Sequence, residues 1–152
     1  MKSSSASRFV ASVNCSRITQ HGYERWALAV ARILTAREDP RTMHGWSRAA
    51  GASESSLREW CKLARCRPKD SLDLGRVLRA LSAGAAVSGR DDLASVLDIR
   101  DGRTFQRLME RAGILKMGGA PTMEVVLRAN RLAINRKALT CLGRLLGVRC
   151  LE

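Results

Sequence analysis

Apolar side chains recur along this chain at intervals of three and four residues, the spacing of one face of an α-helix. Residues 23–36 show the pattern most clearly, with Trp26, Val30 and Ile33 on one face, and the run closes at Pro40. Ala, Leu and Arg are abundant, whereas β-branched and aromatic residues are sparse, which favours helices over strands. We therefore predict an all-α protein.

Two short helices are expected next. The spacing predicts one helix over 43–50 and another from 54 to 63 or slightly beyond, with Ser53 as the N-cap of the second. Pro68 then breaks the chain. Residues 71–83 carry apolar side chains on two sides, which is typical of a long connecting helix packed on both flanks.

The second half of the chain repeats these signals. Asp91 and Asp92 place negative charge at the start of a helix, and Asp101 is suited to cap the next one, which stops at Gly113.

Two more amphipathic segments follow at 123–132 and 135–146. Their apolar residues are Val125, Val126, Leu127, Leu139, Leu142, Leu145 and Leu146. These side chains are suited either to cover the domain or to pair with another copy of the chain, and covering is the favoured interpretation.

The charge is strongly one-sided. Lys and Arg number 27 against 14 Asp and Glu, a net charge of +13, which points to a polyanionic partner. Charge alone does not separate DNA from RNA or anionic lipid. No uncharged stretch approaches the ~20 apolar residues of a membrane span, and the Ser-rich start lacks the features of a secretory signal. We expect a cytoplasmic, nucleoid-associated protein.

The five cysteines are expected to be reduced thiols. Cys61 and Cys66 form a close pair, but their spacing is not C-x-x-C and an odd total does not close a disulfide framework. Packing in the core is favoured for both. The alternative is redox sensing, because the neighbours Lys62, Arg65 and Arg67 would favour the thiolate.

Signals for catalysis or metal binding are weak. His21 and His44 are isolated from each other and from any tight cysteine pair. The sequence has no Gly-rich phosphate loop, no cluster of carboxylates and no convincing Ser/His/Asp set. We expect no enzyme activity, no cofactor and no metal.

An internal repeat organises the chain. Residues 46–52 align with 93–99, and a second alignment follows after a turn that is one residue longer in the second copy. It pairs Leu57 with Phe105, Trp60 with Leu108 and Cys61 with Met109. The chain therefore contains two related helix-turn-helix units.

The residue types suit such units. Ser47 and Ala94 are small where two helices cross, and Gly51 permits the positive φ of a sharp turn. Leu57 and Trp60, like the residues that match them, are expected to face the core. The outer face of the second helix is polar in both units: Ser55, Arg58, Glu59 and Lys62 in the first, and Arg103, Thr104, Gln106, Arg107 and Arg111 in the second. Such side chains suit base edges and phosphates.

The two units resemble the DNA-binding domain of the AraC/XylS family of bacterial transcription regulators. The residues that match are Gly51, Ser53, Leu57 and Lys62 in the first unit, and Leu93, Ala94, Ile99, Asp101, Phe105, Arg107 and Met109 in the second. The chain departs from the family pattern at Ser47, Glu59, Cys61 and Asp98. The resemblance covers about residues 23–113.

The resemblance implies a transcription regulator that reads a bipartite site on double-stranded DNA, with two helices in successive major-groove segments about 34 Å apart. The implied base-contact candidates are Ser55, Arg58, Glu59, Arg103, Gln106 and Arg107, and the phosphate-contact candidates are Arg48, Lys62, Arg65, Arg100 and Arg111. Glu59 is equally suited to an ion pair with Lys62. RNA polymerase, and a second copy paired through the C-terminal helices, are further candidate partners.

The organisation that follows has five parts. They are a flexible tail at 1–22, a first helix-turn-helix subdomain at 23–68, a linking helix and loop at 69–88, a second unit at 89–118 and a C-terminal helical extension at 119–152. Two rival functions remain: a non-specific RNA or nucleoid binder, and a protein-interaction adaptor whose tail helices dock another chain.

Overall fold

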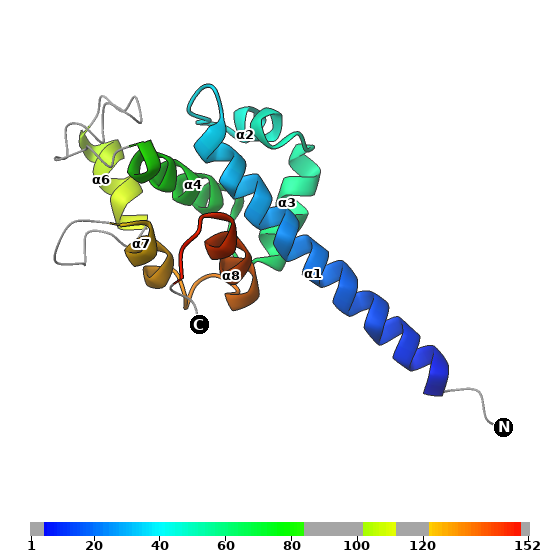
Figure 1. Cartoon of the computed structure of the whole chain (residues 1–152). Coiled ribbons are helices and arrows are strands. Elements are labelled where there is room, and N and C mark those ends of the chain that lie inside the picture. Colours follow the sequence, from blue (N-terminus) through cyan, green and yellow to red (C-terminus); the bar gives the residue numbers. More distant parts are fainter. Residues whose placement is uncertain (1–4, 84–101, 112–121, 150–152) are drawn as a thin grey trace.

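The computed structural model describes residues 5–83, 102–111 and 122–149. Within these ranges the chain is entirely helical (Figure 1), which confirms the predicted all-α class. The helices are α1 (Ser5–Thr35), α2 (Met43–Ala50), α3 (Glu54–Leu63), α4 (Pro68–Ala83), α6 (Gly102–Arg111), α7 (Met123–Ala129) and α8 (Arg136–Leu145).

The core is built around α1 and α4. Trp26, Val30 and Ile33 of α1 are fully buried, and α4 runs against this face. Gly75 lets the two helices approach closely, because a Cβ atom there would collide with the side chain of Ile33. The side chains between these helices are therefore those that recur at intervals of three and four residues along α1.

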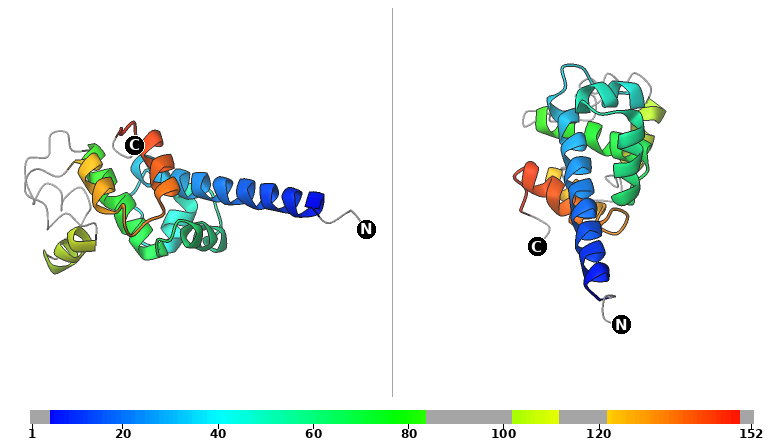
Figure 2. Two further views of the ribbon diagram at one scale, coloured as in Figure 1. Left: turned by 90° about the horizontal axis from the view of Figure 1, so that it is seen from below. Right: turned by 90° about the vertical axis from the view of Figure 1, so that its right-hand side faces the viewer.

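The remaining helices lie on opposite sides of this pair. Figure 2 shows α2, α3 and α6 on one side of α1 and α4, and α8 on the other. The N-terminal half of α1 projects beyond the other helices (Figure 1). Helices α3 and α6 therefore lie on the same side of the molecule.

The first helix is much longer than the sequence pattern predicts. The expected start at Tyr23 is wrong, because α1 begins at Ser5. Residues 5–21 contain no proline and no glycine, so nothing in them interrupts a helix. Gly22 lies inside α1 with the side chain of Leu63 packed against it.

The helix that follows Pro68 is a core element. It begins at Pro68 itself, three residues earlier than predicted, because proline fits the first turn of a helix, where its missing N–H is not needed. All eight residues from Ser71 to Leu78 are buried, since α4 is packed against α1, α2, α3, α6 and α7. Whether α4 also links two subdomains stays a prediction, because the expected helix and turn at 91–101 lie outside the described residues.

Two arginines of α4 secure the end of α1. The Arg76 guanidinium donates to both carboxylate oxygens of Asp39, which follows α1, at 2.8 and 3.1 Å, and both side chains are about nine-tenths buried. Arg79 donates from one terminal nitrogen to the carbonyls of Ile33 and Ala36, at 2.8 and 2.7 Å. The Arg79 bonds satisfy carbonyl groups that the end of α1 leaves without partners.

The C-terminal helices complete the core. Val126 and Leu127 of α7 and Leu139 and Leu142 of α8 are fully buried, and α8 packs along α1. Covering of the domain by these helices is therefore confirmed, and the buried side chains are not available to a second copy. Among the residues predicted for this role, Leu145 is the one left exposed.

Candidate nucleic-acid interface

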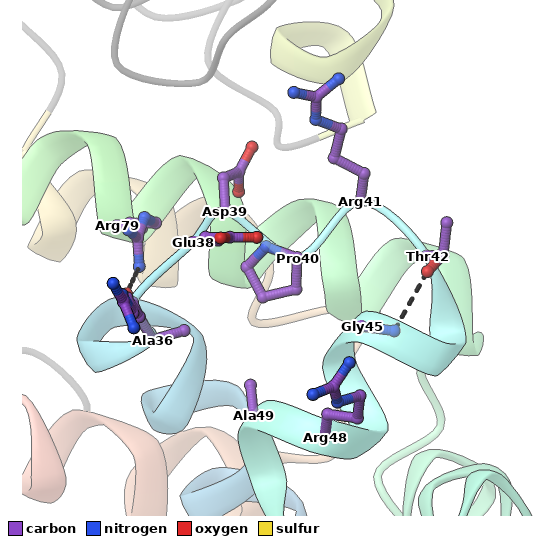
Figure 3. Close-up of a pocket in the computed structure, with 11 residues that line it drawn as sticks. Ala36, Glu38, Asp39, Pro40, Arg41, Thr42, Gly45, Arg48, Ala49 and Arg79 are labelled. Carbon is purple, nitrogen blue, oxygen red and sulfur yellow. Dashed lines mark hydrogen bonds between the residues drawn. The ribbon is translucent and has the colours of Figure 1, made fainter.

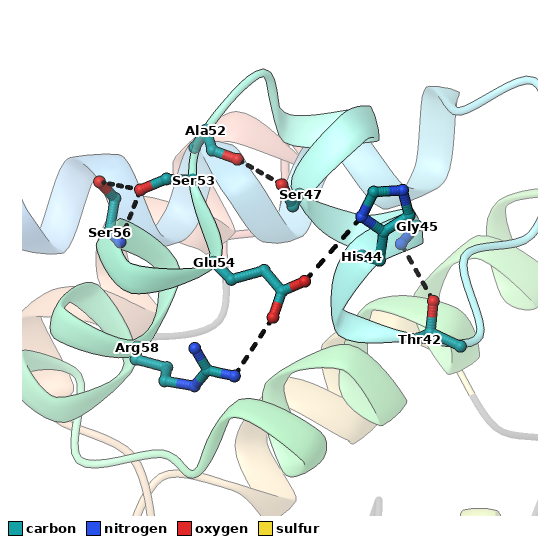
Figure 4. Close-up of polar contacts among 9 residues, drawn as sticks. All are labelled: Thr42, His44, Gly45, Ser47, Ala52, Ser53, Glu54, Ser56 and Arg58. Atoms are coloured by element: carbon teal, nitrogen blue, oxygen red, sulfur yellow. Dashed lines mark hydrogen bonds and ion pairs between the residues drawn. The ribbon is translucent and has the colours of Figure 1, made fainter.

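The α2–α3 hairpin has the predicted helix bounds, and local side chains fix its turn (Figure 4). Gly51 has φ of +64° directly after α2, the left-handed conformation that glycine adopts without strain. The Ser47 hydroxyl donates to the carbonyl of Ala52 across the turn, at 2.6 Å. Ser53 caps α3 by accepting from the N–H of Ser56 at 3.1 Å, as predicted.

The inner face of α3 is held in the core. Leu57 and Cys61 are fully buried and Trp60 is partly buried, so the predicted inward face is confirmed. The last turn closes with two backbone bonds: Cys66 N–H to the Cys61 carbonyl at 3.0 Å, and Arg65 N–H to the Lys62 carbonyl at 3.1 Å. Arg65 therefore takes a positive φ of 58° at a position where glycine is more usual.

The outer face of α3 is polar and accessible. Ser55, Arg58, Glu59 and Lys62 are all exposed. Arg58 lies 3.2 Å from the Glu54 carboxylate, one helical turn earlier (Figure 4). A surface pair of this kind contributes only about 0.3–0.5 kcal/mol, so it would not hold Arg58 away from a strong ligand.

The expected ion pair between Glu59 and Lys62 is absent. Neither side chain has a hydrogen bond or ion pair within the described residues, whereas Glu54 lies near both Arg58 and His44, at 3.2 and 3.9 Å. Glu59 and Lys62 thus project side by side from the outer face, each available to a partner.

The outer face of α6 is similar in kind. Arg103, Gln106 and Arg107 are exposed, while Leu108 and Met109 turn inward and are buried. The Gln106 amide donates to Glu110 at 3.2 Å. The side chains of Thr104 and Phe105, which the sequence assigned to the outer face and to the core, lie outside the described residues.

One charged contact ties α6 to α4. The Arg111 Nε lies 3.1 Å from a carboxylate oxygen of Asp73, whose side chain is 8% exposed. That oxygen accepts no aligned hydrogen bond within the described residues, so the attraction is mainly Coulombic. Burial raises the pKa of Asp73, and the charges of Arg111, Arg76 and Lys69 partly oppose the shift.

The predicted phosphate-contact residues fall into three groups. Arg48, Lys62 and Arg65 are exposed. Arg111 is engaged by Asp73, so part of its role is to hold α6. Arg100 lies outside the described residues.

The two neighbouring cysteines are core residues. Burial is the main cause that raises the pKa of Cys61, and likewise of Cys66, to about 11. A hydrogen bond from the Cys61 thiol to the Ser71 hydroxyl, at 3.4 Å, only partly opposes this shift. Arg67 lowers the pKa of Cys66 in part, but burial outweighs it, so the thiolate that redox sensing would require is disfavoured. Core packing is confirmed.

In the described parts of the chain, no three His, Cys, Asp or Glu side chains are grouped as a metal ion would require. None of the helices described there has the length and apolar character needed to cross a bilayer. Models of known protein families, curated proteins and solved structures were all compared with the chain. None of them matches it.

Sequence reasoning missed two features of this surface. The first is the Glu54–Arg58 pair, which the i,i+4 spacing of opposite charges could have indicated. The second is the contact between Asp73 and Arg111. This ion pair joins residues far apart in the chain, so no local sequence pattern predicts it.

Proposed function

We propose that this chain is a DNA-binding protein that places α3 in the major groove of double-stranded DNA and acts as a transcription regulator. The observation that carries the proposal is the α2–α3 hairpin. It has a sharp glycine turn and a buried inner face, and its outer face carries exposed Ser55, Arg58, Glu59 and Lys62. Helix-turn-helix proteins present their reading helix in this way.

The chemistry of the outer face supports base reading. Arginine donates to guanine O6 and N7, and a carboxylate accepts from cytosine N4. Arg58 is therefore suited to guanine and Glu59 to cytosine, on the same helix. The net charge of +13 supports attraction to the phosphate backbone.

A second reading helix is the finer part of the proposal. Arg103, Gln106 and Arg107 project from α6, on the side of the molecule that also carries α3 (Figure 2). We assign α6 to the adjacent groove segment, so that one chain covers a bipartite site. The similarity of the two units to AraC/XylS regulators supports this assignment.

The proposal is tested by comparing two substitutions in gel-shift assays with selected and random duplexes. Lys62→Ala should weaken binding to every duplex alike, because it removes a phosphate contact, while Arg107→Ala should reduce discrimination between sequences. Arg144→Ala on α8, on the opposite side, is the matched charge control and should change binding least. If about six phosphates are contacted, the logarithm of affinity should fall with the logarithm of salt with a slope near −5.

The rival functions give different results in the same assays. Binding to single-stranded RNA as tight as to duplex DNA would favour the non-specific binder. Absence of any duplex binding at low salt would contradict the proposal, and would favour the adaptor if a partner chain were also recovered.

A further inference from the structure

A groove of about 1100 Å³ opens between the end of α1, the loop that follows it, α2 and α4 (Figure 3). None of the exposed residues on the outer face of α3 lines it. The groove therefore lies away from the base-reading face of α3, although Arg48, a predicted phosphate contact, lines the groove. Its size is comparable to pockets that hold small organic ligands.

The lining of the groove is rich in arginine. Arg37, Arg41, Arg48 and Arg79 line it, together with the acids Glu38 and Asp39. The charge of Asp39 is already neutralised by its buried, bidentate ion pair with Arg76. Among the described lining residues, Arg37, Arg48 and Arg79 consequently outnumber the remaining acid, Glu38.

Arg79 is a fixed cation in this lining. Its bonds at 2.8 and 2.7 Å go to the carbonyls of Ile33 and Ala36, which are neutral groups. The end of a helix contributes only about half a negative charge, so the guanidinium is held in place without full compensation. A cation held in advance binds an anion without the entropy cost of ordering a free side chain.

Two further arginines are available beside it. Arg37 follows the end of α1 and Arg48 lies on α2, and both are exposed. Neither has a hydrogen bond or ion pair within the described residues, although Glu38 lines the same groove. The three guanidinium groups thus come from three segments that border one hollow.

We propose that this groove binds a phosphate group, with Arg79 as the fixed cation and Arg37 and Arg48 closing on the ligand from the rim. Planar guanidinium groups match the paired oxygens of phosphate, which makes arginine well suited to this chemistry. The phosphate can belong to a small free ligand or to a nucleic-acid backbone. The site stands on the groove alone and does not depend on the DNA-binding proposal.

The test is an NMR titration of the full chain with inorganic pyrophosphate at constant ionic strength and without DNA. We expect saturable shifts of the backbone amides of Gly45 and Ala49, which line the groove. The double variant Arg37→Ala, Arg48→Ala should weaken the affinity about tenfold or more, because it removes charge-assisted hydrogen bonds. Both side chains are exposed, so the fold should be retained.

A matched control separates a site from diffuse attraction. Arg136→Ala, Arg144→Ala removes two exposed arginines from α8 and should leave the affinity within about twofold. Glu38→Gln should tighten binding, because it removes the opposing charge. The proposal is overturned if no saturable shift occurs up to about 10 mM pyrophosphate, where even a millimolar site would be filled, or if both double variants weaken binding equally.

Adding duplex DNA to the pyrophosphate complex identifies the source of the phosphate. Release of pyrophosphate assigns the groove to the nucleic-acid backbone, and simultaneous binding assigns it to a small free ligand. Since pyrophosphate binding is measured first and alone, failure of the groove and failure of the DNA-binding proposal are distinguishable.

Discussion

The two candidate reading helices are held in place by different means. Ser53 caps α3, a glycine turn precedes it, and Leu57 and Cys61 lie in the core. The described contacts of α6 are made mainly with α4, through Leu108 and Met109 and the ion pair of Arg111 with Asp73. Both outer faces carry exposed polar side chains, but packing fixes the first helix, whereas the second depends in part on charge.

The two helices should therefore respond differently to salt and pH. A helix fixed by apolar packing keeps its position across salt and pH, while one held partly by an ion pair responds to both. We therefore expect the α3 half of a bipartite DNA site to be bound firmly and the α6 half to be the adjustable one.

The largest effect should come from the core contact of α3. Leu57→Ala removes a fully buried side chain and should lower the free energy of unfolding by about 3 kcal/mol, from lost burial and the cavity left behind. Urea denaturation measures it. Leu132→Ala, at a 92% exposed leucine, is the control and should change stability by less than about 0.5 kcal/mol. Equal effects of the two would remove the basis for calling α3 the anchored helix.

A local effect is expected at α6. Arg111→Ala leaves the buried carboxylate of Asp73 without its cation on α6, and should speed hydrogen exchange of the α6 amides about tenfold, since a buried negative charge is then less compensated. The α3 amides should keep their protection. Arg107→Ala, at an exposed neighbour, is the control. Acceleration spread evenly over both helices would contradict the contrast.

The cap of α3 should have a smaller effect. Ser53→Ala deletes the acceptor for the Ser56 N–H and should reduce stability by about 1 kcal/mol. Ser55→Ala removes an exposed hydroxyl from the same helix and should change it by less than about 0.5 kcal/mol. Thermal or urea unfolding decides, and a cap variant as stable as its control would show that the turn does not fix the start of α3.

Asp73 should add a modest pH dependence. Because burial raises the pKa of Asp73 in the folded chain, its ionised form is disfavoured there, and the chain loses stability as the pH rises above the ordinary value of 3.8. Asp73→Asn does not ionise. The stability of this variant relative to the wild type should therefore increase as the pH rises from about 3.8 through the raised pKa of Asp73. A difference that is constant or falls with pH would mean that Arg111 and Arg76 outweigh burial.

The smallest expected effect is a gain in stability. Arg65 has a positive φ, which costs a side-chain-bearing residue about 1 kcal/mol, while glycine has more freedom to lose on folding. Arg65→Gly should therefore stabilise the chain by about 0.5 kcal/mol or less. Arg65→Ala keeps the Cβ atom and should show no gain in the same melting experiment.

Local signals explain what the sequence could predict. Gly51 and Ser53 mark the turn and the cap by their own chemistry, and the bounds of α2 and α3 follow from them. The apolar pattern did not predict the start of α1 at Ser5. Gly22 lies inside this helix, where Leu63 of another helix packs against it. The position of α8 against α1 is likewise a matter of long-range packing.

The candidate site shows the same limit. The exposed polar face of α3 could be predicted, because helical spacing places Leu57 inside and Arg58 and Glu59 outside. The thiol of Cys61 was open to misinterpretation, since charged neighbours in sequence do not face a buried sulfur. The partners of Asp73 and Arg79 come from other helices, and only the folded chain brings them together.

The central claim is that the outer face of α3 reads bases in duplex DNA. Selection of bound sequences from a random duplex pool tests it directly, using the wild type and a variant carrying Ser55→Ala, Arg58→Ala and Glu59→Ala. The wild type should enrich two short blocks about one helical turn apart, and the variant should lose one block and keep the other. Identical blocks in both chains, or no enriched sequence with the wild type, would contradict it.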